Sequence, residues 1–263
     1  MHVVAIVELA TSVDAEAAAL AADLRATAYD VRLLLAGGTP AVVRSTPAEA
    51  GAAEVVAKLR ARGHDAVAVD TAAVVASATM TSMRRFRLER DGISLDDRPG
   101  VTLPYDDIAT LVSAVHRRRS DTSTETRERK FDPARAIMSG GVLLSKTTRT
   151  ATRTATEDRE GVLYLFRRSG GAPWLLRERG TSWAGHGEPL APSESENFRA
   201  AVAALRARAP RAVYDDRLVS RKSTPERTAV AGGGGTTTVH TSSEGGTDLL
   251  AHVIALAARG AGV

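Results

Sequence analysis

The chain has 263 residues, of which 43% are hydrophobic and 25% are charged; these values are close to the averages of globular domains, so neither a fibrous nor a wholly disordered protein fits. It contains no cysteine, which excludes a disulfide scaffold, a thiol nucleophile and any cysteine-ligated metal site. The formal net charge of +4 is divided unevenly, as −3 over residues 1–79, +6 over residues 80–180 and +1 over residues 181–263, and such asymmetry indicates different roles for the segments.

The first 70 residues predict the element order β-α-α-β-α-β. Val3 to Glu8 is a β-branched run typical of a buried strand, and Asp14 stands where it could cap a helix with an apolar stripe. Thr46-Pro47-Ala48-Glu49 has the Thr, Pro and Glu that typically begin a helix. We therefore expect three strands, at residues 3–8, 41–45 and 66–70, and three helices, beginning near residues 14, 29 and 47.

This order resembles the fold of the ClpS adaptor, which the C-terminal domain of the bacterial ribosomal stalk protein shares. The resemblance is carried by the strand–helix–strand end, in the phrases Ala41-Val42-Val43 and Lys58-Leu59-Arg60-Ala61-Arg62-Gly63-His64-Asp65-Ala66-Val67-Ala68-Val69. It implies that residues 1–75 form a three-stranded antiparallel sheet packed with helices. It also implies that this domain is a non-enzymatic docking module.

The resemblance does not extend to the adaptor's recognition of its substrates. The adaptor binds the N-terminal residue of degradation substrates with an Asn/Asp pair after the first strand and a His in the last turn of the second helix. In this chain the corresponding segments are Glu8-Leu9-Ala10 and Ala36-Gly37-Gly38. The resemblance therefore supports the fold and argues against that recognition.

After a segment of small residues, 71–82, the apolar period changes to two, which predicts strands. The segments Arg87–Ile93 and Leu103–Ile108 resemble the opening of a bacterial pleckstrin-homology-like domain, and a helix with one apolar face over Ser193–Arg208 resembles its closing element. The resemblance implies a mainly β domain over residues 83–218. The whole chain is therefore expected to be α+β.

An Arg-rich insert, residues 117–160, interrupts this second domain. Its Thr-rich alternation is strand-like and favours long polar β-arms. Its basic side chains could bind an anionic lipid headgroup, a phosphorylated partner or nucleic acid, but no aromatic residue interleaves the arginines for base stacking, so nucleic acid is disfavoured. Acidic residues also intervene, so cross-strand ion pairing on a solvated arm is the alternative interpretation. The candidate anion- or partner-binding residues are Arg117, Arg118, Arg119, Arg127, Arg129 and Lys130.

The end of the chain is predicted to be a linker followed by a helix. Residues 219–246 include four consecutive glycines and have the composition of a flexible linker. Residues 247–263 carry an apolar stripe at helical spacing but are too few to span a membrane. We expect this helix to dock on its own protein or on a partner, through Leu249, Leu250, Val253 and Ile254.

No pattern in the sequence predicts catalytic residues, a cofactor or a metal. The six histidines are not spaced as helical metal ligands, and the four-glycine run lacks the lysine of a phosphate-binding loop. The paired carboxylates are adjacent in sequence, so on a strand they would face opposite ways. No Gly-x-Ser-x-Gly motif is present to activate a serine.

These observations predict a non-enzymatic protein-interaction or adaptor-type protein with an unidentified protein partner. The alternative is a peripheral anion- or phospholipid-binding module that uses the Arg-rich insert, and an enzyme of unrecognised type is a third hypothesis. The N-terminus has no basic region and reaches a carboxylate at Glu8, too early for a signal peptide. This absence predicts a cytoplasmic protein.

Overall fold

The computed structural model describes residues 1–131, 145–187, 189–221, 226–231 and 236–260, and within these it describes only the backbone of residues 125–131, 145–152, 226–231 and 236–237. The fold is α+β, which confirms the expected class. Contacts divide the chain into two compact units. Unit 1 consists of Met1–His116, Glu160–Thr224 and Ser243–Val263, and unit 2 consists of Arg117–Arg159 and Pro225–Ser242.

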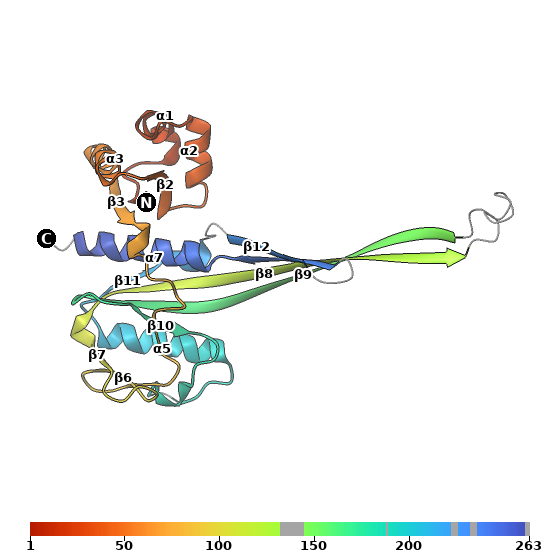
Figure 1. Ribbon diagram of the computed structural model, residues 1–263. Helices are drawn as coiled ribbons and strands as arrows, with labels where there is room; N and C mark the ends of the chain where they lie inside the picture. The colour runs from red at the N-terminus through yellow and green to blue at the C-terminus, as the bar shows by residue number, and fades with distance from the viewer. Residues whose placement is uncertain (132–144, 188, 222–225, 232–235, 261–263) are drawn as a thin grey trace. The chain divides into compact units, whose positions relative to one another are not determined.

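The N-terminal part of unit 1, which we call the N-terminal lobe, is a three-stranded sheet with three helices (Figure 1). The sheet order is β2-β1-β3, and both pairs are antiparallel. This arrangement confirms the predicted element order. The elements are β1 (His2–Glu8), α1 (Val13–Leu24), α2 (Ala28–Leu35), β2 (Ala41–Thr46), α3 (Glu49–Ala61) and β3 (Asp65–Asp70).

Local hydrogen bonds set the helix boundaries of this lobe. Ser12, rather than Asp14, caps α1, because its hydroxyl accepts from the Ala15 N–H. Thr27 and Asp30 form a reciprocal capping box at α2. Thr46 ends β2 instead of capping α3, which begins three residues later without a side-chain cap.

The remainder of the chain forms a small antiparallel sheet, β5-β6-β7, and a seven-stranded mixed sheet. The larger sheet has the order β12-β13-β8-β9-β10-β4, with β11 also paired to β8. The elements are β4 (Thr81–Ser82), β5 (Phe86–Leu88), β6 (Gly92–Leu95), β7 (Thr102–Pro104), β8 (Ile108–Phe131), β9 (Ser145–Arg167), β10 (Trp174–Arg177), α5 (Glu194–Arg208), β11 (Val213–Asp216), α6 (Arg217–Ser220), β12 (Glu226–Ala231), β13 (Thr236–Ser242) and α7 (Glu244–Gly260), with 3-10 turns at Thr71–Ala73, Tyr105–Asp107 and Trp183–Gly185.

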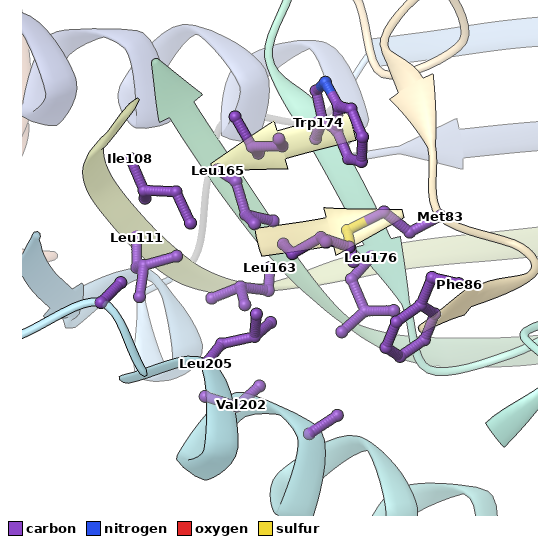
Figure 2. Close-up of a cluster of buried hydrophobic side chains, with 14 of the residues drawn as sticks. Met83, Phe86, Ile108, Leu111, Leu163, Leu165, Trp174, Leu176, Val202 and Leu205 are labelled. Carbon is purple, nitrogen blue, oxygen red and sulfur yellow. The ribbon is translucent and has the colours of Figure 1, made fainter. Parts of the chain in front are cut away.

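Strand β9 is apolar on both faces where it runs through unit 1. Successive side chains of a strand point to opposite faces, and here Leu163 and Leu165 join one buried cluster whereas Tyr164 and Phe166 join another. Figure 2 shows the first cluster, in which Leu205 of α5 points toward the sheet. Helices α5 and α7 therefore cover opposite faces of this part of the large sheet.

Helix α7 is buried on two sides. Leu250 and Ile254 pack with residues of the large sheet such as Val112 and Tyr164, whereas Val253 and Ala257 pack with Ala5, Val7, Val67 and Val69 of the N-terminal lobe. The predicted docking residues therefore dock in cis: Leu250, Val253 and Ile254 are buried, and Leu249 is half-buried against the second of these clusters. Of the two alternatives that the sequence left open, docking on the same chain or on a partner, the structure has the first, because both sheets have an apolar face that α7 covers.

Residues 219–246, predicted as a flexible linker, also require correction. This segment contains β12 and β13, which pair antiparallel, and β13 pairs with β8 in turn. Helix α7 begins at Glu244, before the predicted boundary. The glycines dominated the composition, but the Thr- and Val-containing runs on either side of them have high strand propensity and find a strand to pair with.

The position of α7 predicts where substitutions will be costly. Ile254→Ala should lower the free energy of unfolding by about 2–5 kcal/mol, because it leaves a cavity between α7 and the large sheet. Leu256→Ala on the same helix is the matched control and should cost much less, because Leu256 is 40% exposed. Urea unfolding of the full chain measures both. Equal effects at the two positions would contradict the central position of α7.

Candidate functional site

The Arg-rich insert makes up most of unit 2, which we call the arm. Arg118 and Arg119 are exposed and Arg117 is half-buried. Arg119 donates through Nε and Nη2 to the carboxylate of Asp121, at 2.9 and 3.0 Å, and this hydrogen bonding raises the pKa of the Arg119 guanidinium. The two residues are two positions apart and so share a face of β8. This ion pair lies within one strand, whereas the alternative interpretation expected ion pairs across strands.

The other three predicted cations, Arg127, Arg129 and Lys130, are placed only by their backbone. They lie on β8, and their side chains fall outside the described part of the chain. The structure therefore brings all six candidate residues onto one strand, and it describes the surroundings of only the first three.

The arm is a long polar ribbon built on two long strands, with β13 and β12 paired beside part of β8. Strands β8 and β9 have 24 and 23 residues, whereas strands of globular proteins usually have about 3–10. Every residue from 153 to 159 of β9 is exposed, so both faces of this stretch meet solvent and bury no core. The expectation of a long polar β-arm is met here.

Charge is concentrated in the arm. By sequence, unit 2 contains twelve basic and seven acidic side chains, a net charge of +5, whereas unit 1 contains 23 basic and 24 acidic side chains, a net charge of −1. The excess positive charge of the chain therefore belongs to the arm, and the rest of the chain is nearly neutral.

A buried polar cluster surrounds Asp248 of α7. Its carboxylate accepts hydrogen bonds from the Tyr164 hydroxyl at 2.7 Å, from the Ser77 N–H at 2.7 Å and from the Ser77 hydroxyl. Three donors thus compensate the loss of water around a carboxylate that is only 2% exposed. Burial, followed by the charge of Asp248, raises the pKa of the Tyr164 phenol well above its usual value, so Tyr164 acts as a hydrogen-bond donor.

The cluster extends to Glu244 in the first turn of α7. His116 Nε2 lies 2.7 Å from the Tyr164 hydroxyl oxygen, and His116 Nδ1 lies 3.3 Å from a carboxylate oxygen of Glu244. Arg177 donates to Glu160 at 3.0 Å and to Glu244 at 3.4 Å. His116 is 1% exposed and Tyr164 is fully buried, so substrate has no access to these atoms. The cluster fixes α7 against the sheet and does not have the form of an active site.

The cluster was not predicted from the sequence, because a helix that begins at residue 247 has Asp248 in its first turn. Asp248 instead lies inside α7, three and seven residues before Ala251 and Ala255, which pack against the large sheet. A carboxylate on the apolar face of a helix is the signal that could have revealed it. His116 and Tyr164 lie in separate strands, and no local spacing connects them to Asp248.

A groove of about 620 Å³ lies beside α5. Glu178 accepts from the Gly161 N–H at 2.7 Å and from the Ser195 hydroxyl, and a Cβ at position 161 would come within 2.8 Å of the same carboxylate. The Arg206 guanidinium stacks over the Tyr214 ring, 3.8 Å from its centroid. These polar groups bind one another, which makes the groove a weaker candidate for a ligand site.

Within the part of the chain that the structure describes, no three His, Asp or Glu side chains are grouped so that they could hold a metal ion. Among the helices described, none is long and apolar enough to cross a membrane. These two findings concern the described residues alone.

Comparison of the chain with models of protein families, with curated proteins and with solved structures finds no match. The resemblances to the ClpS adaptor fold and to pleckstrin-homology-like domains therefore stay predictions, and the function has to be argued from the geometry of the chain itself.

Removal of the Tyr164 hydroxyl tests the buried cluster. Tyr164→Phe should lower the free energy of unfolding by about 1–3 kcal/mol, because it takes a hydrogen bond from buried Asp248 and from His116. Tyr29→Phe is the control, since Tyr29 is 71% exposed and its loss of a hydroxyl should change stability little. Chemical denaturation of the two variants gives the comparison, and a Tyr164→Phe protein as stable as the parent would refute the role assigned to the cluster.

His252, one turn after Asp248, predicts a pH dependence of stability. Its Nδ1–H donates to the Asp248 carbonyl at 2.8 Å and its Nε2 accepts from the Val75 N–H at 3.2 Å, so the neutral ring is the one that fits. Burial lowers the pKa of His252 below its ordinary value of 6.5. Between 6.5 and this lower pKa the unfolded chain binds a proton that the folded chain does not, so stability falls as pH decreases.

Unfolding at pH steps from 7.5 to 5 measures this effect. The free energy of unfolding of the parent chain should fall more steeply with decreasing pH than that of His252→Gln, which cannot titrate at this position. His240→Gln, a substitution at an exposed histidine, should keep the parent's slope. Parallel curves for the parent and His252→Gln would show that His252 contributes nothing to the pH dependence.

Proposed function

We propose that this chain is a non-enzymatic protein-interaction protein that contacts its partner through the arm. The observation that carries the proposal is the polar ribbon of β8 and β9, which has exposed side chains at every position from 153 to 159 and a net charge of +5 by sequence. Beyond Thr124 no described strand joins β8 and β9, and a two-stranded ribbon is marginally stable by itself and costs conformational entropy to order. The described side chains of the arm add no buried residue to the core, so its use is sought outside the chain.

Backbone pairing and charge both favour a protein partner. Strand β10 pairs with β9 from Val162 to Leu165, Glu178 covers Gly161, and no described strand covers that edge of β9 from Ser145 to Glu160. An exposed strand edge presents unpaired N–H and C=O groups that an extended segment of a partner can join. The positive charge of the arm favours an acidic partner surface and accelerates the encounter with it.

The N-terminal lobe supports the same class of function. Its sheet order and its helices are compatible with the docking-module resemblance of residues 1–75. The polar cluster around Asp248 has a structural explanation, so it requires no catalytic role. The proposal includes an adaptor-type role, which rests on the fold of the N-terminal lobe and on the structural role of the Asp248 cluster.

The alternative function is peripheral binding to anionic phospholipids. The net positive charge of the arm favours it, since basic side chains near an anionic bilayer gain electrostatic attraction that salt weakens. Arg119 argues against it, because its guanidinium is engaged by Asp121. The protein-partner proposal is preferred because it also uses the edge of β9.

Two variants, each of which replaces three arginines by glutamine, test the proposal. Arg117, Arg118 and Arg119 are changed together to glutamine, and a control protein carries the same change at the exposed residues Arg84, Arg85 and Arg87 of unit 1. Affinity capture from native cells should recover at least one protein with the parent and the control but at least about tenfold less with the arm variant. Equal recovery by all three baits, or no recovery by any, contradicts the proposal.

Co-sedimentation with vesicles of phosphatidylserine and phosphatidylcholine decides between the two functions. The protein-partner proposal expects little sedimentation at physiological salt with any of the three proteins. Sedimentation of the parent and the control that disappears with the arm variant, and that falls with added salt, would favour the phospholipid alternative.

A further inference from the structure

A cavity of about 450 Å³ lies in unit 1, apart from the arm, where three arginines meet. Thr110 of β8 lines it, together with Arg168 from the turn after β9, Arg211 from the loop before β11 and Arg259 from the end of α7. These four residues come from four distant positions in the sequence. Only the packing of α7 and β11 beside β8 brings them to one cavity.

No carboxylate lines this cavity, so its three positive charges have no counter-charge within its wall. Asp107, the nearest acidic residue along the strand, is occupied by the Arg167 guanidinium and by the backbone N–H and hydroxyl of Ser169. Asp106 reaches Arg211 only at 4.0 Å, with both side chains largely exposed, and such a pair contributes little.

Two of the guanidiniums are held in place by the backbone. Arg168 Nη2 donates to the Arg211 carbonyl at 2.6 Å, and Arg259 Nη2 donates to the Arg167 carbonyl at 2.6 Å. Each of these bonds uses one of the five N–H donors of a guanidinium. The side chains are thus oriented at little further cost in entropy, and most of their donors stay available for an anion.

Thr110 supplies a second and independent observation. Its side chain is fully buried and its hydroxyl oxygen has no hydrogen-bond partner among the described residues. It shares a face of β8 with Val112 and Ala114, the face that packs toward α7. A buried hydroxyl without a partner costs free energy, whereas a bound oxyanion would accept its proton and remove that cost.

We propose that this cavity binds the phosphate group of a soluble phosphomonoester. Three guanidiniums and a hydroxyl suit a tetrahedral dianion, which presents more acceptor oxygens and more charge than a single carboxylate. The small apolar side chains of Ala109, Val213 and Ala258 also line the cavity, and they leave room for the organic part of such a ligand. The proposal is independent of the arm and of the function assigned to it.

Isothermal titration calorimetry of the full chain at constant ionic strength tests the proposal, with glycerol 3-phosphate, inorganic phosphate, sulfate and acetate as probes. Glycerol 3-phosphate should bind with the highest affinity and acetate should not bind measurably. Inorganic phosphate that binds more tightly than glycerol 3-phosphate would overturn the assignment of a phosphomonoester in favour of the free ion. Absence of saturable binding by both phosphate probes would overturn the site itself.

Two variants locate the binding. Arg211→Gln should weaken the binding of glycerol 3-phosphate by about tenfold or more, because a charge-assisted hydrogen bond is lost, whereas Arg84→Gln, at an exposed position of unit 1, should leave it unchanged. Thr110→Val keeps the shape of the side chain, so it should raise the melting temperature of the free protein and weaken binding several-fold. Unchanged affinity in both cavity variants would overturn the proposal, whatever their stability.

Discussion

The packing of α7 between two sheets is the interaction on which the rest of unit 1 depends. A helix that is apolar on two sides is stable only where both sides are covered. Leu250 and Ile254 pack against the large sheet, whereas Val253 and Ala257 pack against the N-terminal lobe. The alternation of side chains along β1 matches this arrangement, because Val4 and Ile6 face the lobe's own helices and Ala5 and Val7 face α7. One helix therefore completes two cores that the N-terminal residues and the large sheet would otherwise leave open.

Apolar packing alone leaves the rotation and the axial position of a helix loosely specified, and the polar cluster supplies what is missing. Asp248 is satisfied only where the Tyr164 hydroxyl and Ser77 meet its carboxylate. His252, four residues later, is satisfied only where the Val75 N–H meets its ring. A shift of α7 by one residue would bury these groups without partners, at a cost that exceeds the net gain of each hydrogen bond. Burial of polar groups here specifies a single arrangement of the helix.

Those parts of the fold that rest on local patterns could be predicted from the sequence. The β-branched run of β1, the apolar stripe of α1 and the Thr-Pro-Ala-Glu segment at the start of α3 each carry their own signal. The role of α7 could not be predicted, because an apolar stripe does not reveal which surface covers it. The strands β12 and β13 could not be predicted, because the glycines between them dominate the composition of the segment and because pairing with β8 depends on the tertiary fold. Of the candidate sites, the arm could be predicted from its Thr and Arg content. The cavity of Arg168, Arg211 and Arg259 could not, since no motif links residues so far apart.

The distribution of charge separates the roles that we propose for the arm and for the cavity. By sequence, the arm carries the excess positive charge of the chain, and among its described cations Arg118, Arg119, Arg153 and Arg159 are exposed. Its attraction for a partner should therefore act over distances comparable to the Debye length and weaken steeply with salt. The rest of the chain is close to neutral, and the three arginines of the cavity therefore have no wider positive field behind them. Their effect is short-ranged and depends on directed hydrogen bonds and on the buried hydroxyl of Thr110. Added salt should consequently weaken binding by the arm strongly and binding in the cavity less. The formal charge of +4 for the whole chain predicts neither behaviour.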